Sequence, residues 1–321
     1  QLVELISENA THGICQLLPV KLNGFNSDLK LKNIYSLNMK RKVPDIRAIS
    51  KLNRVIESFK PKIIHTWMYH TSLIESIVRI LNKNNHISLV WGLRCSNMDV
   101  QYYSFQLSII IKLCKYLSFK PDLIIHNSYS GKKFHDKLGY SNNSIVVSNG
   151  IDTDRFVPNK KYRTNIRKYY NISDKITVIL CVARRDPMKD HKTLISSFQR
   201  INNEFSNIIL LLAGKDTEYY SKFDNIVGLG VYKNISEVYA ASDIIVSSSA
   251  FGEGFSNALA EGMSSELVPI ATEVGDSREI VGDTGILVPT RNEAALSAAM
   301  IEILRLSKKE LILKKRNARI R

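Results

Sequence analysis

Short apolar runs alternate with amphipathic helical segments along most of this 321-residue chain. Each run has four to seven residues, is rich in β-branched side chains and is apolar on both faces, as strands inside a parallel sheet are. The pattern predicts βαβ units, and so an α/β fold with helices on both faces of parallel sheets. The expected strands are 62–65, 87–91, 122–126, 144–147, 176–182, 207–213, 243–247, 268–272 and 285–288, and the expected helices of the first half are 72–81, 104–117 and 130–138.

A polar segment that contains a Gly and a Pro, residues 148–158, separates two such series, and the polar stretch 159–174 follows it. We therefore expect two Rossmann-like, doubly wound domains, residues 1–147 and 148–321, that face each other across a cleft. Ligands of open α/β sheets bind beyond the C-terminal ends of the strands. Two facing sheets would hold a ligand from both sides.

The formal charge of +15 is unevenly placed. Residues 1–150 carry 20 basic and 9 acidic residues, whereas residues 201–300 carry 5 basic and 14 acidic residues. The basic half is a solvated basic surface or a face that docks on an anionic membrane. We do not expect nucleic acid as a partner, because no zinc finger, RNP-type aromatic motif or basic-region helix is present. Four scattered cysteines without a CxxC pair exclude a disulfide scaffold and a zinc ribbon.

The segment 104–118 places Lys112 and Lys115 among isoleucines and leucines, with Lys120 just beyond it. A core helix with snorkelling lysines is the reading we favour. The alternative is a helix that lies on anionic lipid. No apolar run reaches the length of about 18 residues that a membrane span needs.

Two cations follow the strand expected at 176–182, and they are the first candidates for chemistry. Arg184 and Lys189 are five positions apart on the loop that leaves this strand. Arg as a fork and Lys as a point charge suit a diphosphate. The alternative is a pair of loop ion pairs with Asp186 and Asp190.

A second loop, after the strand 243–247, opens a helix with Gly254, Ser256 and Asn257, and the N–H groups at such a helix start can bind an anion. Glu253 precedes this helix and Glu261 lies about two turns inside it, where carboxylates can accept hydrogen bonds from sugar or ribose hydroxyls. Glu261 could equally be a capping or surface residue. A third loop of small residues, 274–279, follows the strand 268–272. Three such loops at successive strand ends are more specific than any one of them.

Together these motifs resemble the retaining family-4 glycosyltransferases of the GT-B fold. The resemblance covers almost the whole chain, and in the first half the segments 64–70 and 90–96 resemble the branch that acts on bacterial surface polysaccharides. The motifs are Arg184-x4-Lys189, Glu253-Gly-Phe-Ser-Asn with Glu261, Gly275-x3-Glu279, Ser148-Asn-Gly-Ile-Asp-x-x-Arg-Phe156, Leu229-Gly-Val-Tyr-Lys233 and Ile235-x-x-Val-Tyr-Ala-Ala-Ser-Asp243.

The resemblance implies a nucleotide-diphosphate-sugar donor, held mainly by the second domain. It assigns the diphosphate to Arg184 and Lys189, the sugar hydroxyls to Glu253 and the ribose hydroxyls to Glu261. It implies no cofactor and no metal. Gly254, Phe255, Ser256 and Asn257 would line the sugar-phosphate, Tyr232 and Lys233 the base, and His70 and Arg94 the acceptor side.

The implied function is metal-independent transfer of a hexosyl or N-acetylhexosaminyl group, from a UDP-sugar rather than a GDP-sugar, to a glycan or lipid-linked glycan acceptor. Such a transferase would be cytoplasmic and peripheral on the inner face of the plasma membrane, in polysaccharide or glycolipid synthesis. The alternatives are a nucleotide-sugar-binding module without activity and a GT-B synthase that acts on a soluble sugar. The configuration at the anomeric carbon would be retained either through the donor phosphate or through Glu253 as nucleophile.

The chain departs from the family pattern at four places. It opens at Gln1–Ser7, which has a helical pattern, so the family's first strand and Gly-rich loop would lie before it. The crossover helix that ends the second domain would follow Arg321, and we therefore expect this 321-residue piece to be inactive by itself. Arg94 stands where many relatives have His. It would either bind phosphate or, as we favour, form an ion pair with Asp99. Ser265-Glu266 replaces a helix C-cap that Gly suits better.

Overall fold

The computed structural model describes residues 11–19, 33–40, 45–82 and 86–321, so the helical pattern of residues 1–7 lies outside the described residues. The chain divides into two compact units. The first comprises Gln1–Leu93, Ser104–Ile125 and Asp136–Ile145, and the second comprises Arg94–Tyr103, His126–His135 and Val146–Arg321.

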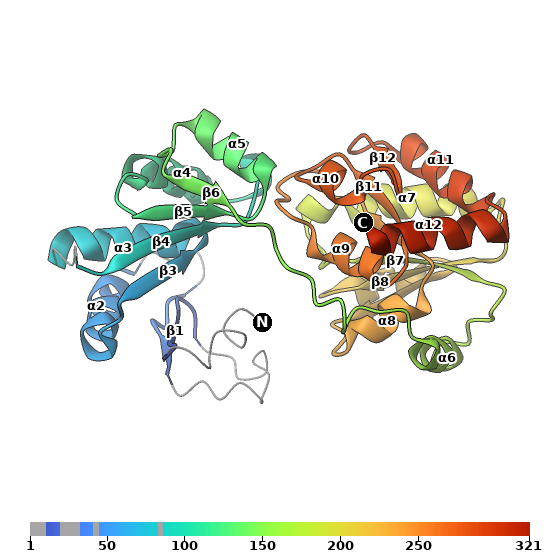
Figure 1. Cartoon of the computed structure of the whole chain (residues 1–321), viewed down its shortest axis with the longest axis horizontal. Helices are drawn as coiled ribbons and strands as arrows, with labels where there is room; N and C mark the ends of the chain where they lie inside the picture. Colours follow the sequence, from blue (N-terminus) through green and yellow to red (C-terminus); the bar gives the residue numbers. More distant parts are fainter. Residues whose placement is uncertain (1–10, 20–32, 41–44, 83–85) are drawn as a thin grey trace. The chain divides into compact units, whose positions relative to one another are not determined.

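A four-stranded sheet in the order β3-β4-β5-β6 forms the centre of the first half of the chain (Figure 1). The parallel pair β3 and β4 sets Ile63–Trp67 beside Ser88–Gly92. A separate parallel pair, β1 and β2, joins Ile14–Gln16 to Ile34–Ser36. The strands are β3 (Ile63–Trp67), β4 (Ser88–Leu93), β5 (Leu123–His126) and β6 (Ser144–Val146), and the helices are α2 (Arg47–Phe59), α3 (Met68–Asn82), η2 (Val100–Tyr102), α4 (Phe105–Leu117) and α5 (Tyr129–Leu138).

The second unit is built on a six-stranded sheet in the order β12-β11-β10-β7-β8-β9, in which all neighbouring strands are parallel. Sequential strands run outward from β7 to β9, and the chain then returns to place β10 on the other side of β7. This is the doubly wound order, whose reversal lies between β7 and β10. The strands are β7 (Thr177–Val182), β8 (Ile208–Ala213), β9 (Ile226–Gly230), β10 (Ile244–Ser247), β11 (Val268–Thr272) and β12 (Ile286–Val288).

Helices cover both faces of this sheet (Figure 1). Successive residues of a strand point to opposite faces, so each strand packs against helices on both sides. In β7, Ile179 and Cys181 pack with α7 and α11, whereas Val178 and Leu180 pack with α8, α9 and α12. The helices are α6 (Lys160–Tyr169), η3 (Pro187–Lys189), α7 (His191–Asn202), η4 (Thr217–Lys222), α8 (Ile235–Ala241), α9 (Asn257–Ser264), α10 (Ser277–Val281), α11 (Glu293–Leu304) and α12 (Lys308–Ile320).

The nine expected strands are all present, and the expected α/β class is confirmed. The sequence reasoning did not identify α6, which lies inside the stretch 159–174 that we took as merely polar. Asn159 caps this helix by accepting a hydrogen bond from the Tyr162 N–H at 3.0 Å. Ile166 and Arg167 form its buried side, so a charged residue stands where an apolar one marks most amphipathic helices.

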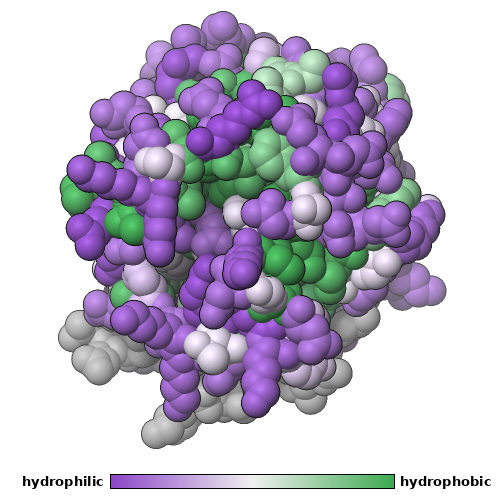
Figure 2. All heavy atoms as spheres, turned by 90° about the vertical axis from the view of Figure 1, so that its right-hand side faces the viewer, coloured by the Kyte–Doolittle hydropathy of each residue, from purple (hydrophilic) through white to green (hydrophobic). Residues whose placement is uncertain are grey.

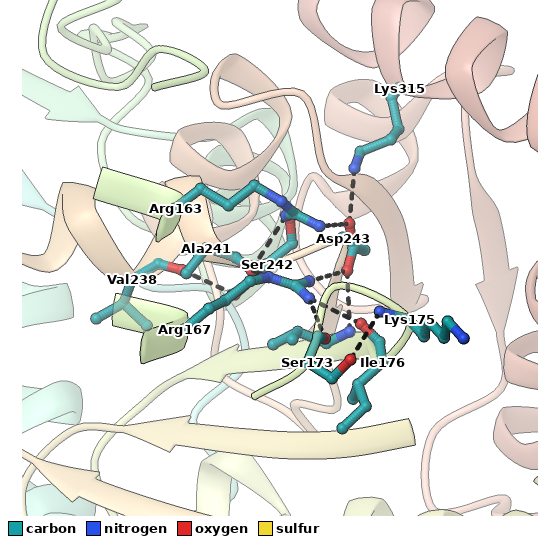
Figure 3. A network of polar contacts seen from close by, with 11 residues as sticks. Arg163, Arg167, Ser173, Lys175, Ile176, Val238, Ala241, Ser242, Asp243 and Lys315 are labelled. Atoms are coloured by element: carbon teal, nitrogen blue, oxygen red, sulfur yellow. Dashed lines mark hydrogen bonds and ion pairs between the residues drawn. The ribbon is translucent and has the colours of Figure 1, made fainter. Parts of the chain in front are cut away.

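Asp243 explains how Arg167 can be buried (Figure 3). Its carboxylate accepts from Arg167 at 2.8 Å, Arg163 at 3.0 Å, Lys315 at 2.9 Å and the Val178 N–H at 3.0 Å. Burial acts to raise the pKa of Asp243, but Lys315, Arg163 and these hydrogen bonds lower it overall. The network joins α6, α12, β7 and β10, so Asp243, which belongs to the motif 235–243, has a structural role.

The side of the second unit that carries α11 and α12 is mostly hydrophilic, with apolar side chains exposed in a hollow (Figure 2). A surface recess lies between these two helices. No helix among the described residues is long and apolar enough to cross a membrane. The recess is lined by Ala298, Ile301, Glu302, Arg305, Leu306 and Glu310.

Candidate active site

Loops from neighbouring strands meet at the C-terminal edge of the six-stranded sheet, at the reversal between β7 and β10. Ligands of doubly wound sheets bind at this reversal. The Ala250 N–H donates to the Met188 carbonyl at 2.8 Å, which fastens the loop after β10 to the loop after β7. A small recess there is lined by Cys181–Ala183, Lys189, Ile245–Ser249, Ser256, Ala258 and Leu259.

Lys189 and Glu253 form an ion pair beside this recess. The Glu253 Oε1 atom also accepts a hydrogen bond from the Ser249 hydroxyl at 2.7 Å, and Glu253 is only 8% exposed. Lys189 ends η3 after β7, whereas Ser249 and Glu253 follow β10. The structure thus unites one predicted diphosphate residue with one predicted sugar residue, and adds Ser249, which sequence reasoning missed.

Arg184 is exposed, and its guanidinium forms a fork on one oxygen of Asp186, with Nε at 3.0 Å and Nη2 at 2.8 Å. Burial acts to raise the pKa of Asp186, but the Met188 N–H and Arg184 lower it overall. The alternative pairing of Arg184 with Asp186 is therefore present. Lys189 instead pairs with Glu253, and the Asp190 carboxylate caps α7 by accepting from the Thr193 N–H at 3.2 Å.

Helix α9 begins at Asn257 after Ser256, whose side chain makes no capping hydrogen bond. The first N–H groups of the helix therefore remain available to an anion. The loop before α10 packs against the start of this segment, since the Asp276 N–H donates to the Gly254 carbonyl at 3.0 Å. Gly275 has φ +63°, and a Cβ there would lie 2.4 Å from the same carbonyl, so only glycine fits. The three predicted loops do meet at one edge.

Glu261 lies half-buried on α9 and accepts a hydrogen bond at 2.9 Å from the hydroxyl of Tyr239 on α8. Burial raises the pKa of Glu261, while Tyr239 and the positive charge of Arg155 act to lower it. Phe156 packs edge-on against the Tyr239 ring at 5.6 Å. The three motifs that contain residues 155–156, 239 and 261 therefore converge on one carboxylate.

The remaining predicted residues are more dispersed. Tyr232 is half-buried against the core that contains α8 and α9, and Lys233 is exposed beside it. Arg94 donates to the Asn149 side chain, and Asp99 pairs with Arg291 at 3.7 Å. Phe255 is partly buried in the same core as Tyr232, Asn257 is exposed, and His70 is exposed on α3 in the first unit.

Within the described part of the chain, no group of three His, Cys, Asp or Glu side chains is arranged to hold a metal ion. Arg184 and Lys189 place two positive charges on the loop after β7. The four cysteines are free thiols.

Residues 176–306 match the family described as glycosyl transferases group 1. This segment, which is less than half of the chain, is similar to the group 1 glycosyltransferases. The resemblance to this family that the motifs predicted is thereby confirmed, and the GT-B fold that it implies is confirmed by the solved structure described below. The matched segment contains the Lys189–Glu253 pair, the start of α9 and Glu261.

Two curated relatives have sequences similar to this chain, one over 251 residues and the other over 88 residues. The chain is 28% identical over 251 residues to an uncharacterized glycosyltransferase of Methanocaldococcus jannaschii, which covers 71% of this chain and 59% of the relative. It is 30% identical over 88 residues, 27% of this chain and 23% of the relative, to a GDP-mannose-dependent alpha-(1-6)-phosphatidylinositol monomannoside mannosyltransferase of Mycobacterium tuberculosis. The chain thus spans less than two thirds of the length of either relative.

A solved structure extends the fold similarity to both halves of the chain. Anabaena HepE in complex with UDP is similar with a TM-score of 0.73 at 16% identity, over 90% of this chain and 80% of HepE. At this identity the similarity speaks for the fold alone.

Proposed function

We propose that this chain acts in a retaining glycosyltransferase that moves a hexosyl or N-acetylhexosaminyl group from a UDP-sugar to a glycan acceptor carried on a lipid. The observation that carries the proposal is the Lys189–Glu253 pair beside the start of α9, at the strand reversal of the segment that matches the group 1 family. HepE, solved with UDP and with UDP-glucose, supports the choice of UDP. The mannosyltransferase relative, named as GDP-mannose-dependent, makes GDP the competing nucleotide.

The donor diphosphate would lie between Arg184, Lys189 and the first N–H groups of α9. Arg184 already presents its fork to a carboxylate, and the same fork fits two phosphate oxygens. Negative charge grows on the diphosphate as the sugar departs, and in this arrangement these groups would stabilise it. Two side-chain cations and a helix start can provide this stabilisation, so we propose a metal-independent reaction.

Glu253 would bind hydroxyls of the transferred sugar. Its Oε1 atom is held by Lys189 and Ser249, so the carboxylate is oriented and its charge is largely compensated. A compensated carboxylate is a weak nucleophile, which favours direct transfer on one face of the sugar. In that step the acceptor oxygen bonds to the anomeric carbon, the bond to the diphosphate breaks with its electron pair on the leaving oxygen, and the acceptor proton passes to that phosphate.

The base would lie near Tyr232 and Lys233, which follow β9 at the same edge of the sheet, and Glu261 would accept hydrogen bonds from the ribose hydroxyls. These assignments come from the family motifs. They agree with the position of Glu261 on the same helix whose start faces the recess.

Thermal stability with UDP, GDP and ADP, without added metal and with EDTA, tests the donor site. A ligand at 100 times its Kd adds about 2.7 kcal/mol to the free energy of unfolding. We expect a shift with UDP that survives EDTA. Arg184→Ala and Lys189→Ala should each weaken UDP binding roughly 10-fold or more, because each removes a charge-assisted hydrogen bond.

The matched controls are Arg200→Ala and Lys192→Ala, which remove exposed cations from α7. They should leave the UDP shift unchanged. An equal loss of the UDP shift in all four variants would mean that the shift depends only on the net positive charge of the protein. A stability shift with GDP alone would identify GDP, not UDP, as the donor nucleotide. Nucleotide binding with no release of sugar from any tested UDP-sugar would favour a binding module without activity.

The surface of α4 supports contact with an anionic membrane near a lipid-linked acceptor. Ile111 and Cys114 are buried on one side of the helix, while the other side exposes Phe105 at 78% and Tyr116 at 75%. Lys112 on this exposed side carries positive charge, and the segment 104–120 contains three lysines and no acidic residue. A solvent-facing helix side rich in large apolar groups and lysines suits the surface of an anionic bilayer.

Cosedimentation with vesicles of phosphatidylglycerol and phosphatidylcholine tests this contact. We expect binding that falls with salt, falls on pure phosphatidylcholine, and falls in Phe105→Ser/Tyr116→Ser. The control is Ile63→Ser, which removes an exposed apolar side chain from β3. Equal binding by the double variant and the control would exclude α4 as the docking surface.

A further inference from the structure

Tyr239 is fully buried yet directs its hydroxyl at a candidate donor-binding residue. The side chain is 0% exposed, and its Oη atom lies 2.9 Å from Glu261 Oε2 and 3.1 Å from the Ala258 carbonyl oxygen. Both acceptors belong to α9. Because a carboxylate is the stronger acceptor, the hydroxyl proton goes mainly to Glu261.

The ring of Tyr239 is held in place independently of this bond. It packs edge-on against Phe156, and it lies in the core that also contains Leu259 of α9. The Phe156 carbonyl in turn accepts from Ser264 of α9 at 2.7 Å. A fixed ring fixes the position of the hydroxyl, which then restricts the rotamers of Glu261.

We infer that Tyr239 is a positioning residue, which holds Oε2 of Glu261 so that the carboxylate is oriented toward the two ribose hydroxyls of the donor nucleotide. The inference rests on the proposed role of Glu261. Without the bond from Tyr239, the Glu261 side chain would sample several rotamers, and nucleotide binding would have to select one of them.

The hydrogen bond also affects the charge state of Glu261. Among the described residues, the charged and titratable groups that face this carboxyl are Tyr239 on α8 and Arg155 in the segment before α6. Burial raises the pKa of Glu261, and the Tyr239 bond opposes that effect. Burial also raises the pKa of Tyr239 well above its ordinary value, so the phenol remains a donor at neutral pH.

The test compares UDP with 2′,3′-dideoxy-UDP, which lacks the hydroxyls that Glu261 would bind, on Tyr239→Phe. The ring and its packing are retained in this variant. We expect wild-type protein to prefer UDP roughly 10-fold or more, the loss expected for a hydrogen bond to a charged group. Tyr239→Phe should weaken UDP binding several-fold, leave dideoxy-UDP binding unchanged, and shift to higher pH the point at which UDP affinity declines on acidification.

Tyr170→Phe is the matched control, since Tyr170 packs on the same core but is not one of the described groups that act on the Glu261 carboxyl. Glu261→Gln gives the effect of losing the carboxylate itself, and adding Tyr239→Phe to it should have little further effect. If Tyr239→Phe weakens UDP and dideoxy-UDP equally, or leaves the pH of decline in place, Tyr239 has only a packing role. If wild-type protein binds both nucleotides equally, the ribose assignment of Glu261 fails instead.

Discussion

Glu75 offers a test of the electrostatics of the first unit. This carboxyl lies on α3 with 4% of its surface exposed, and its Oε2 atom has no hydrogen-bond partner among the residues that the structure describes. Burial raises its pKa from 4.5 to about 7, although Arg79 acts to lower it. We predict that Glu75→Gln makes the first unit more stable at pH 8 and less sensitive to pH.

The magnitude follows from linkage between proton binding and folding. Between pH 4.5 and 7 the folded protein keeps a proton on Glu75 that the unfolded chain has released, so stability falls as the pH rises through this window. At about 1.36 kcal/mol per pKa unit, the full decline is roughly 3 kcal/mol and is complete above pH 7. Gln cannot ionise, and its own buried amide costs about 1 kcal/mol or more, so we expect a gain of about 1 to 2 kcal/mol at pH 8.

Urea unfolding followed by tryptophan fluorescence reports on this unit, because the two tryptophans of the chain, Trp67 and Trp91, both belong to it. The urea concentration at the wild-type midpoint should decrease as the pH is raised from 5 to 8. The Glu75→Gln midpoint should change much less. Glu57→Gln, at an exposed carboxyl of α2, should behave like wild type. A wild-type midpoint that does not fall across this range, or falls equally in Glu75→Gln, would refute the reasoning.

Two further predictions concern the second unit, and circular dichroism can follow both. Glu266, which follows the C-cap residue of α9, has φ +61°, a left-handed conformation that costs a residue with a Cβ about 1 kcal/mol. Glu266→Gly should therefore raise stability by about that amount, whereas Asn171→Gly, at φ +54°, should gain less because Asn tolerates this region; equal gains would contradict the argument. Asp243→Asn should destabilise by about 3 to 5 kcal/mol at pH 7, since it leaves buried Arg167 uncompensated. Because the folded pKa of Asp243 is lowered, this stabilisation is present above the unfolded value of 3.8 and is lost at lower pH, so the difference between wild type and variant should shrink on acidification.

Nine strands of the four-stranded and six-stranded sheets could be predicted because burial on both faces leaves continuous apolar runs, whereas the short pair β1 and β2 was not predicted. The strand β9 was not predicted, because Gly228 and Gly230 interrupt its apolar pattern. The reason for Gly228 is a contact, since a Cβ there would lie 2.1 Å from the Thr217 carbonyl oxygen. The helix α6 was not predicted, because its buried side carries a charged residue. That residue, Arg167, is neutralised by Asp243, 76 positions away. No local pattern encodes either partner.

The candidate site could be predicted at the level of which loops meet, because parallel strands bring their C-terminal ends to one edge. Individual partners could not. Asp190 is the neighbour of Lys189 in sequence, yet its carboxylate caps α7 while Lys189 reaches Glu253. Tyr239 stood in a quoted motif without a role, because its acceptor on α9 is set by helix packing.

The strand reversal of the second unit makes the Lys189–Glu253 ion pair independent of the length of chain between the two residues. Lys189 and Glu253 are 64 positions apart, but they follow neighbouring strands, β7 and β10. Insertions or deletions in the connections between β7, β8, β9 and β10 would leave the ion pair intact. The length of this part of the chain can therefore vary in evolution. A one-residue insertion inside β10 would instead turn its side chains to the opposite face of the sheet.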